Sequence, residues 1–176
     1  PTDASLNYSF HPIAGSVYDS GSSSDYRMVL YNWFGSKYDG QSYYIKNVNI
    51  DSYCYNVGLF GTTAGAEIAN IVLYSDNGAV IQRNTDPTPS SGTRTVRQYS
   101  TSYALGGLVG IAYDYNSSMG NGSITNCAIA GYTVADNSRN KQHLGEAAIG
   151  GLVGVSSVNL NKCSAVVDLQ INCTHV

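Results

Sequence analysis

The chain has 176 residues, of which only 12% are Asp, Glu, Lys or Arg, and its formal net charge is −3. An average globular domain has about 25% charged residues, and here Gly, Tyr, Ser and Asn take their place. The charge excludes a basic surface for nucleic acid or anionic lipid, and no apolar run reaches the about 18 residues that a membrane span needs.

The length indicates one domain over residues 1–176 with a core of its own. No stretch of about 12 residues has helical apolar spacing, whereas short runs of Val, Ile, Leu and Tyr alternate with Gly, Asn, Ser and Asp. The sequence therefore predicts an all-β fold. Because the chain begins at Pro1 and not at Met, we expect a processed N-terminus or an excised fragment.

Internal repeats divide the chain into coils. A Gly-Leu-x-Gly motif occurs three times, at Gly58, Leu59 and Gly61, at Gly107, Leu108 and Gly110, and at Gly151, Leu152 and Gly154. We expect a lead-in and first coil over 10–82, a loop insertion over 83–102, a second coil over 103–136, a loop over 137–146 and a third coil over 147–176.

A second motif follows each copy of the Gly-Leu-x-Gly motif and also precedes the first copy. It consists of Ile or Leu, then any residue, then Asn or Lys. Apolar residues continue three and five positions after the Ile, so the inward alternation reverses at the Asn. A corner produces such a reversal, and Asn tolerates the left-handed conformation that a corner can require. The predicted corner residues are Asn47, Asn70, Asn126 and Lys162. Equivalent corners imply stacked coils that share one core, a β-solenoid; the alternative is an antiparallel sandwich in which the motifs recur by chance.

These motifs resemble a known family. Gly-Gly-Leu-Val-Gly followed by Ile-x-Asn-Cys is similar to the GLUG repeat, and His11–Gly15 and Tyr38–Val48 resemble its lead-in elements. The resemblance covers nearly the whole chain, and departs from the pattern at Ala14 and at Lys162, where Asn is expected. It implies a right-handed parallel β-solenoid (β-helix) with long loop insertions. GLUG repeats occur mainly in extracellular and cell-surface proteins, including adhesin-like ones, and imply no single activity.

Catalytic motifs are absent from the sequence. The residues His11, His143 and His175 have no partner at metal-binding spacing, and there is no nucleophile elbow or phosphate loop. Asp114 and Asn116 resemble only a fragment of a calcium loop. We therefore expect no enzyme, no cofactor and no metal, although the sequence leaves open a paired-carboxylate glycosidase site.

Four cysteines and four Asn-x-Ser/Thr sequons are candidate modification sites. Cys127 and Cys163 follow equivalent corners, so in adjacent coils they would lie about 4.8 Å apart, within disulfide range; the alternative is two small buried apolar side chains. The disulfide candidates are Cys54, Cys127, Cys163 and Cys173. The glycosylation candidates are Asn7, Asn116, Asn121 and Asn172, although an Asn- and Ser-rich chain forms such triplets by chance.

Two function classes remain. The first is a non-catalytic extracellular or cell-surface structural or adhesive solenoid. Its open ends would be covered by another copy or by a neighbouring domain, and head-to-tail stacking would give a filament. The C-terminal strand 165–172, apolar on its inner face, supports this expectation. The second is a glycan-binding module or carbohydrate-active enzyme that uses paired surface tyrosines at Tyr43 and Tyr44, Tyr53 and Tyr55, and Tyr113 and Tyr115. An ice-binding solenoid would need a Thr-x-Thr ladder, which the sequence lacks.

Overall fold

The computed structural model describes residues 9–10, 12–14, 33–52, 54, 56–84, 103–114, 121–137 and 147–171. All regular structure in these ranges is β, and every pairing between its strands is parallel. The strands form four sheets, called sheets A to D below. The prediction of an all-β chain with parallel strands is confirmed.

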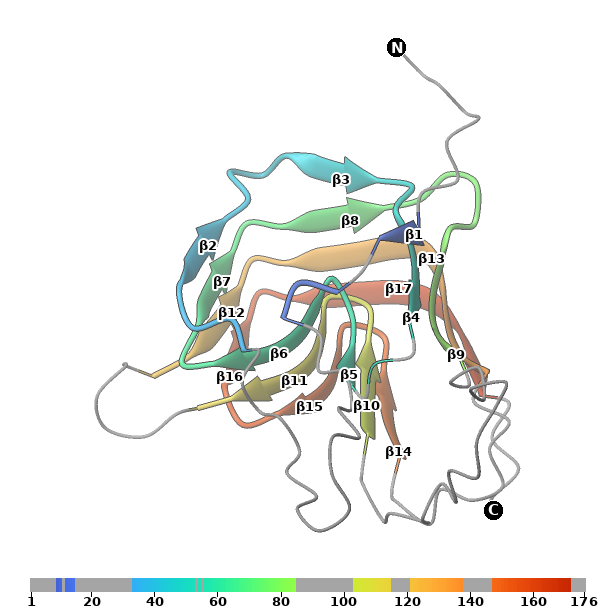
Figure 1. The fold of residues 1–176 in the computed structure, drawn as a ribbon. Helices are drawn as coiled ribbons and strands as arrows, with labels where there is room; N and C mark the ends of the chain where they lie inside the picture. Colours follow the sequence, from blue (N-terminus) through green and yellow to red (C-terminus); the bar gives the residue numbers. More distant parts are fainter. Residues whose placement is uncertain are drawn as a thin grey trace, which may run out of the picture.

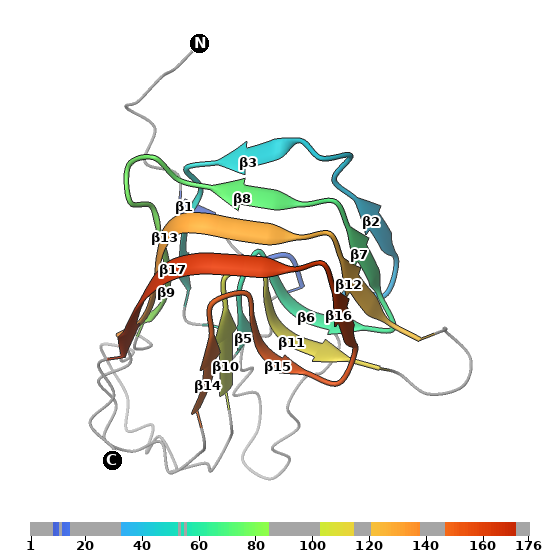
Figure 2. The same cartoon turned by 180° about the vertical axis from the view of Figure 1, so that it is seen from behind.

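Sheet A is the largest. It contains β1 (Ser9–Phe10), β3 (Tyr44–Lys46), β4 (Asn49–Ser52), β8 (Val72–Tyr74), β9 (Val80–Asn84), β13 (Ala128–Asn137) and β17 (Ser164–Ile171). The long β13 pairs with β8 through its first part and with β9 through its last part. In Figure 1, β3, β8, β13 and β17 lie one below another, and Figure 2 shows the same stack from behind.

The other three sheets are narrower. Sheet B contains β6 (Phe60–Ala64), β11 (Val109–Tyr113) and β15 (Val153–Ser156). Sheet C contains β2 (Lys37–Asp39), β7 (Glu67–Ala69), β12 (Ser123–Thr125) and β16 (Asn159–Asn161). Sheet D contains β5 (Asn56–Val57), β10 (Tyr103–Gly106) and β14 (Ala147–Gly150). From β4 onward, the chain passes repeatedly from sheet A to D, B, C and back to A; we call each such pass a rung.

Equivalent positions of successive rungs form columns, and the inward columns make the core. In sheet C, Tyr38, Ile68, Ile124 and Leu160 are in register. In sheet A, the corresponding column contains Phe10, Ile50, Ile81, Val134 and Leu169. The inner members of both columns are buried. Short strands suffice because each rung buries its apolar side chains against the rungs above and below.

The Gly-Leu-x-Gly motifs form the turn from sheet D to sheet B. Their leucines, Leu59, Leu108 and Leu152, are all buried. The first copy makes this turn with one residue fewer, because Val57 pairs with Leu105 but Phe60 pairs with Val109. The glycines allow the rungs to approach closely: a Cβ at Gly110 would lie 2.6 Å from the carbonyl oxygen of Gly61.

The expected loop boundaries need correction at two places. The insertion expected over 83–102 begins later, because Arg83 and Asn84 continue β9 and pair with Asp136 and Asn137 of β13. Asn137 is likewise the last residue of β13 and not the first residue of a loop. Backbone pairing with the neighbouring rung extends both strands past the point where their apolar pattern ends. Residues 85–102 and 138–146 lie outside the described residues.

The two ends of the stack differ. Near the N-terminal end, the rings of Phe34 and Tyr38 contact the ring of Phe60, with centroid distances of 5.2 and 5.6 Å. At the C-terminal end, the inward column positions face solvent: Leu160 is 44% exposed, whereas Ile124 below it is 1% exposed. Likewise Leu169 is 46% exposed above a fully buried Val134.

Candidate functional site: the corner ladder and the outer face of sheet A

A ladder of side-chain amides follows the corner between sheets C and A. Asn126 Nδ2 donates to Asn70 Oδ1 at 2.7 Å, and Asn70 Nδ2 donates to Asp39 Oδ1 at 2.9 Å. The corner residues Asn70, Asn126 and Lys162 have φ values of 57°, 53° and 53°. This left-handed conformation reverses the inward alternation, as the sequence pattern requires. The ladder therefore ends in a carboxylate at its N-terminal end, and Lys162 occupies the corner position beyond Asn126 at the C-terminal end.

Asp39 accepts two hydrogen bonds at this corner. The first comes from the Asn70 amide and the second from the backbone N–H of Gln41, at 2.8 Å from Oδ1. These bonds favour the ionised carboxylate, so they lower the pKa of Asp39, and the Asn70 bond has the larger effect. Asp39 lies at the surface and stays charged over the whole physiological pH range.

Asn47 belongs to a different corner from the one that its motif indicates. It has a φ of 55°, but Ile45 pairs with Leu73 and not with Ile68, so Asn47 lies between β3 and β4 within sheet A. The sequence motif is the same at both corners, and only the stacking of the rungs separates them. In the first rung, Gly40 to Ser42 occupy the sheet C–A corner, where the Ser42 N–H donates to the Asn70 carbonyl at 3.0 Å.

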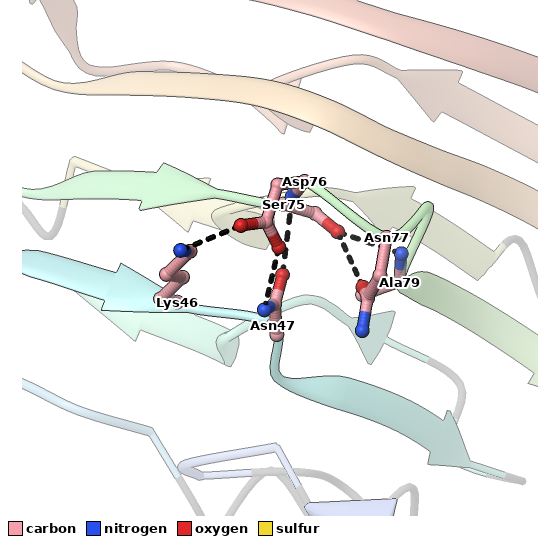
Figure 3. Close-up of polar contacts among 6 residues, drawn as sticks. All are labelled: Lys46, Asn47, Ser75, Asp76, Asn77 and Ala79. Carbon is pink, nitrogen blue, oxygen red and sulfur yellow. Dashed lines mark hydrogen bonds and ion pairs between the residues drawn. The ribbon is translucent and has the colours of Figure 1, made fainter. Parts of the chain in front are cut away.

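The Asn47 corner carries a polar cluster (Figure 3). Asn47 Nδ2 donates to Asp76 Oδ1 at 2.8 Å, and the Asp76 N–H donates to Asn47 Oδ1 at 3.1 Å. Lys46 Nζ lies 2.6 Å from the other carboxylate oxygen. Beside it, Ser75 Oγ accepts from the Ala79 N–H at 2.8 Å. The cluster fixes the connection between β8 and β9 against the preceding rung.

The ion pair shifts the pKa values of both of its members. The hydrogen bond from Lys46 holds the pKa of Asp76 below its ordinary value, with the Asn47 amide adding to the effect. The same bond raises the pKa of Lys46, and the negative charge of Asp76 adds to it. Both side chains are thus charged near neutral pH and engaged with each other, which gives the cluster a positioning role.

Tyrosines stand beside this cluster on the outer face. Tyr43 and Tyr44 are 73% and 71% exposed, and the Tyr44 ring meets Tyr74 edge to face at a centroid distance of 6.5 Å. Lys46 Nζ lies 5.9 Å from the Tyr74 ring centroid. Tyr113 is also exposed, whereas Tyr53, Tyr55 and Tyr115 lie outside the described residues. Of the three predicted pairs, the structure therefore describes one complete pair.

A buried polar network lies where sheet A passes to sheet D. The Tyr103 hydroxyl donates to the Asp136 carboxylate, and the guanidinium of Arg83 lies 4.0 Å from the Tyr103 ring centroid. Arg83 Nε donates to the Cys54 carbonyl at 3.1 Å. All three side chains are buried. This network was not predicted from the sequence, because it joins three strands and because Arg83 was expected to lie in a loop. The only available signal was that a charged residue pairs with Asp136.

The cysteines described by the structure are thiols. Cys54 and Cys127 are buried and Cys163 is half-buried. Cys127 and Cys163 occupy adjacent rungs, because the Ser164 N–H donates to the Cys127 carbonyl at 3.0 Å. Burial raises the pKa of Cys127. Cys173 lies outside the described residues.

The other candidate sites are only partly described. Among the sequons, Asn121 is exposed, and Asn7, Asn116 and Asn172 fall outside the described ranges, as do the three histidines. In the parts of the chain that the structure describes, no group of three or more His, Cys, Asp or Glu residues is placed to hold a metal ion. Asp114 accepts from the Gly122 N–H at 3.3 Å, an ordinary loop contact.

Comparisons with known proteins place the chain in no class. No family model, no curated protein and no solved structure matches it. The described residues contain no helix of the length and apolarity needed to cross a membrane.

Proposed function

We propose that the protein is a non-catalytic structural or adhesive module of the extracellular space or cell surface, and that its copies stack end to end. In this proposal the parallel sheets form a right-handed β-solenoid of the GLUG-repeat type. The proposal of GLUG membership rests on the motifs alone, and the secreted location rests on that resemblance.

The exposed C-terminal rung is the observation that carries the proposal. In the column through sheet C, Leu160 occupies the place that is buried one rung earlier, and Leu169 does the same in sheet A. Covering one such leucine completely is worth about 1.5–3 kcal/mol relative to full exposure. The backbone edge of β17 is also available, because β17 pairs within the described chain only with β13. A further rung would satisfy both the apolar columns and the edge.

The opposite end offers matching columns. Tyr38 continues the column of Leu160, and Phe10 continues the column of Leu169; they are 36% and 39% exposed. If the C-terminal rung of one copy stacks on the N-terminal rung of the next, the column of sheet C continues from Leu160 to Tyr38. Phe10 lies one rung beyond Tyr38, on β4, so β1 of the next copy has to leave β4 for β17 to take its place. A contact of this heterologous kind repeats and produces a filament unless it closes into a ring.

The experiment is analytical ultracentrifugation over a range of concentrations, with electron microscopy of the same samples. The Leu169→Glu variant places a charge on the inward column, and Val166→Glu places the same charge on the outer face of the same strand. We expect concentration-dependent association that Leu169→Glu abolishes and Val166→Glu preserves. A wild-type chain that remains monomeric at high concentration would contradict the proposal.

A second candidate function, glycan binding, is favoured by the exposed rings of Tyr43 and Tyr44 beside the Lys46–Asp76 pair. Exposed aromatic rings can stack on sugar faces while neighbouring polar groups bind hydroxyls. A glycan array tests this candidate. Binding that is lost in Tyr44→Ala and kept in Tyr113→Ala would support it, and an array without binding would refute it.

A further inference from the structure

We propose that Lys162 and Asp39 form an ion pair between successive copies and thereby set the polarity and register of the assembly. This inference rests on the proposed end-to-end stacking. The ion pair would explain why the copies join head to tail and do not pair through two like ends.

The two residues terminate the same corner ladder. Along the stack, the hydrogen-bonded side chains follow the order Asp39, Asn70 and Asn126, and Lys162 holds the corner position of the next rung. Asp39 itself is the last residue of β2, in register with Ala69, directly before the corner of its rung. Lys162 has the same left-handed backbone as the two asparagines and lies over Asn126, whose N–H donates to the Asn161 carbonyl at 2.9 Å. A further copy placed one strand spacing away, about 4.8 Å, would bring its Asp39 to the rung beyond Lys162.

Both charges are available for this contact. Asp39 uses Oδ1 for both of its hydrogen bonds within the chain. The N-terminal edge also carries Lys37 and Lys46, but these are engaged with Glu67 and Asp76 at 2.8 and 2.6 Å. Among the described residues, no carboxylate forms an ion pair with Lys162.

Only one arrangement of the ends brings opposite charges together. An interface of two C-terminal ends would contain two copies of Lys162 and no Asp39, and an interface of two N-terminal ends would contain two copies of Asp39 and no Lys162. Like charges across an interface disfavour such pairings. Head-to-tail stacking opposes Lys162 to Asp39 and at the same time continues the apolar columns from Leu160 to Tyr38.

The test is a charge-swap series measured by sedimentation velocity at low ionic strength. Lys162→Glu alone and Asp39→Lys alone each place like charges at the contact, and we expect each to raise the concentration needed for assembly about tenfold. An equimolar mixture of the two variants, and also the double variant, restores opposite charges at every contact, so both should assemble like the wild type. Salt should weaken wild-type assembly, because the Debye length is about 10 Å at 0.1 M.

Two controls separate the contact from folding. Asp39→Asn removes the charge but keeps an oxygen that accepts from Asn70, and it should weaken assembly without a change in the melting curve. Asp114→Lys makes the same charge change as Asp39→Lys at an exposed residue that follows β11, a strand paired on both sides and therefore away from either end of the stack, and should leave assembly unchanged.

The outcomes distinguish the inference from the function on which it rests. If the wild type does not assemble, the end-to-end function and the ion pair are both refuted. If it assembles and neither single variant changes the assembly, the stacking stands and the ion pair is refuted. If Lys162→Glu weakens assembly but Asp39→Lys does not, Asp39 is not the partner of Lys162, which also overturns the inference.

Discussion

The column through Ile124 and Leu160 permits a quantitative comparison within one chain. Both side chains occupy the same inward position of sheet C in adjacent rungs. Ile124 is 1% exposed and Leu160 is 44% exposed. In each case, truncation to Ala reduces a branched side chain of four carbons to a single carbon. Apart from the branching of Ile and Leu, the difference between the two substitutions is therefore the cover provided by the next rung.

The expected losses of unfolding free energy differ about threefold. Ile124→Ala leaves a cavity enclosed by two rungs, and such substitutions cost about 2–5 kcal/mol. Leu160→Ala loses only the free energy of the buried part of the side chain, which is somewhat over half of the about 1.5–3 kcal/mol for full burial. Solvent fills the space that the side chain leaves. For a chain of this length, each kcal/mol lowers the melting temperature by about 2–4 °C.

The assay is urea unfolding followed by far-ultraviolet circular dichroism, at a dilution where sedimentation shows a single monomeric species. The slope of unfolding free energy against urea should be unchanged in both variants, since the exposed surface changes little. Equal losses for the two substitutions would refute the reasoning, because Leu160 would then be as well covered in the monomer as Ile124.

Three further predictions concern other parts of the fold. Gly110→Ala should cost about 1–3 kcal/mol, because its Cβ would meet backbone atoms at 2.6 Å, whereas Gly78→Ala, with open space and a φ of 72°, should cost about 1 kcal/mol; equal melting temperatures would contradict this. Tyr103→Phe removes the hydrogen bond to buried Asp136 and should cost about 1–3 kcal/mol by thermal unfolding. The folded-state pKa of Asp76 is lowered, so its contribution is present above the unfolded value of about 3.9 and disappears as the pH falls through the folded value. The stability difference between wild type and Asp76→Asn should therefore shrink below pH ~4 in an acid titration, and a constant difference would refute it.

The features that depend on a few consecutive residues could be predicted from the sequence. The reversal of the apolar alternation at Asn70 and Asn126 is a local pattern with a local cause, the left-handed φ of the corner residue. The same local pattern misplaced Asn47, because Ile-x-Asn-Val has the same form at two different corners. Which corner a motif makes depends on the strand with which it pairs, and here Ile45 pairs with Leu73.

The features that join different rungs could not be predicted. The network of Arg83, Tyr103 and Asp136 combines strands whose spacing along the chain depends on the lengths of the intervening segments. These lengths differ from rung to rung, so no fixed period marks the three positions. The outer cluster of Lys46 and Asp76 was missed for the same reason: its two members lie in different rungs.

The unequal lengths of the rungs have a consequence for how such a chain can vary. Between sheets D and B and between sheets C and A, the connections are short and their residues are fixed by close backbone contacts or by a left-handed φ. Length varies instead between sheets A and D, at 53–55, 85–102 and 138–146, and between β11 and β12, at 114–122. Sequence can thus be inserted or exchanged at these two corners without shifting the register of any ladder. The fold separates the residues that maintain it from those that are free to change, and it offers positions where a foreign peptide could be grafted and displayed once per rung.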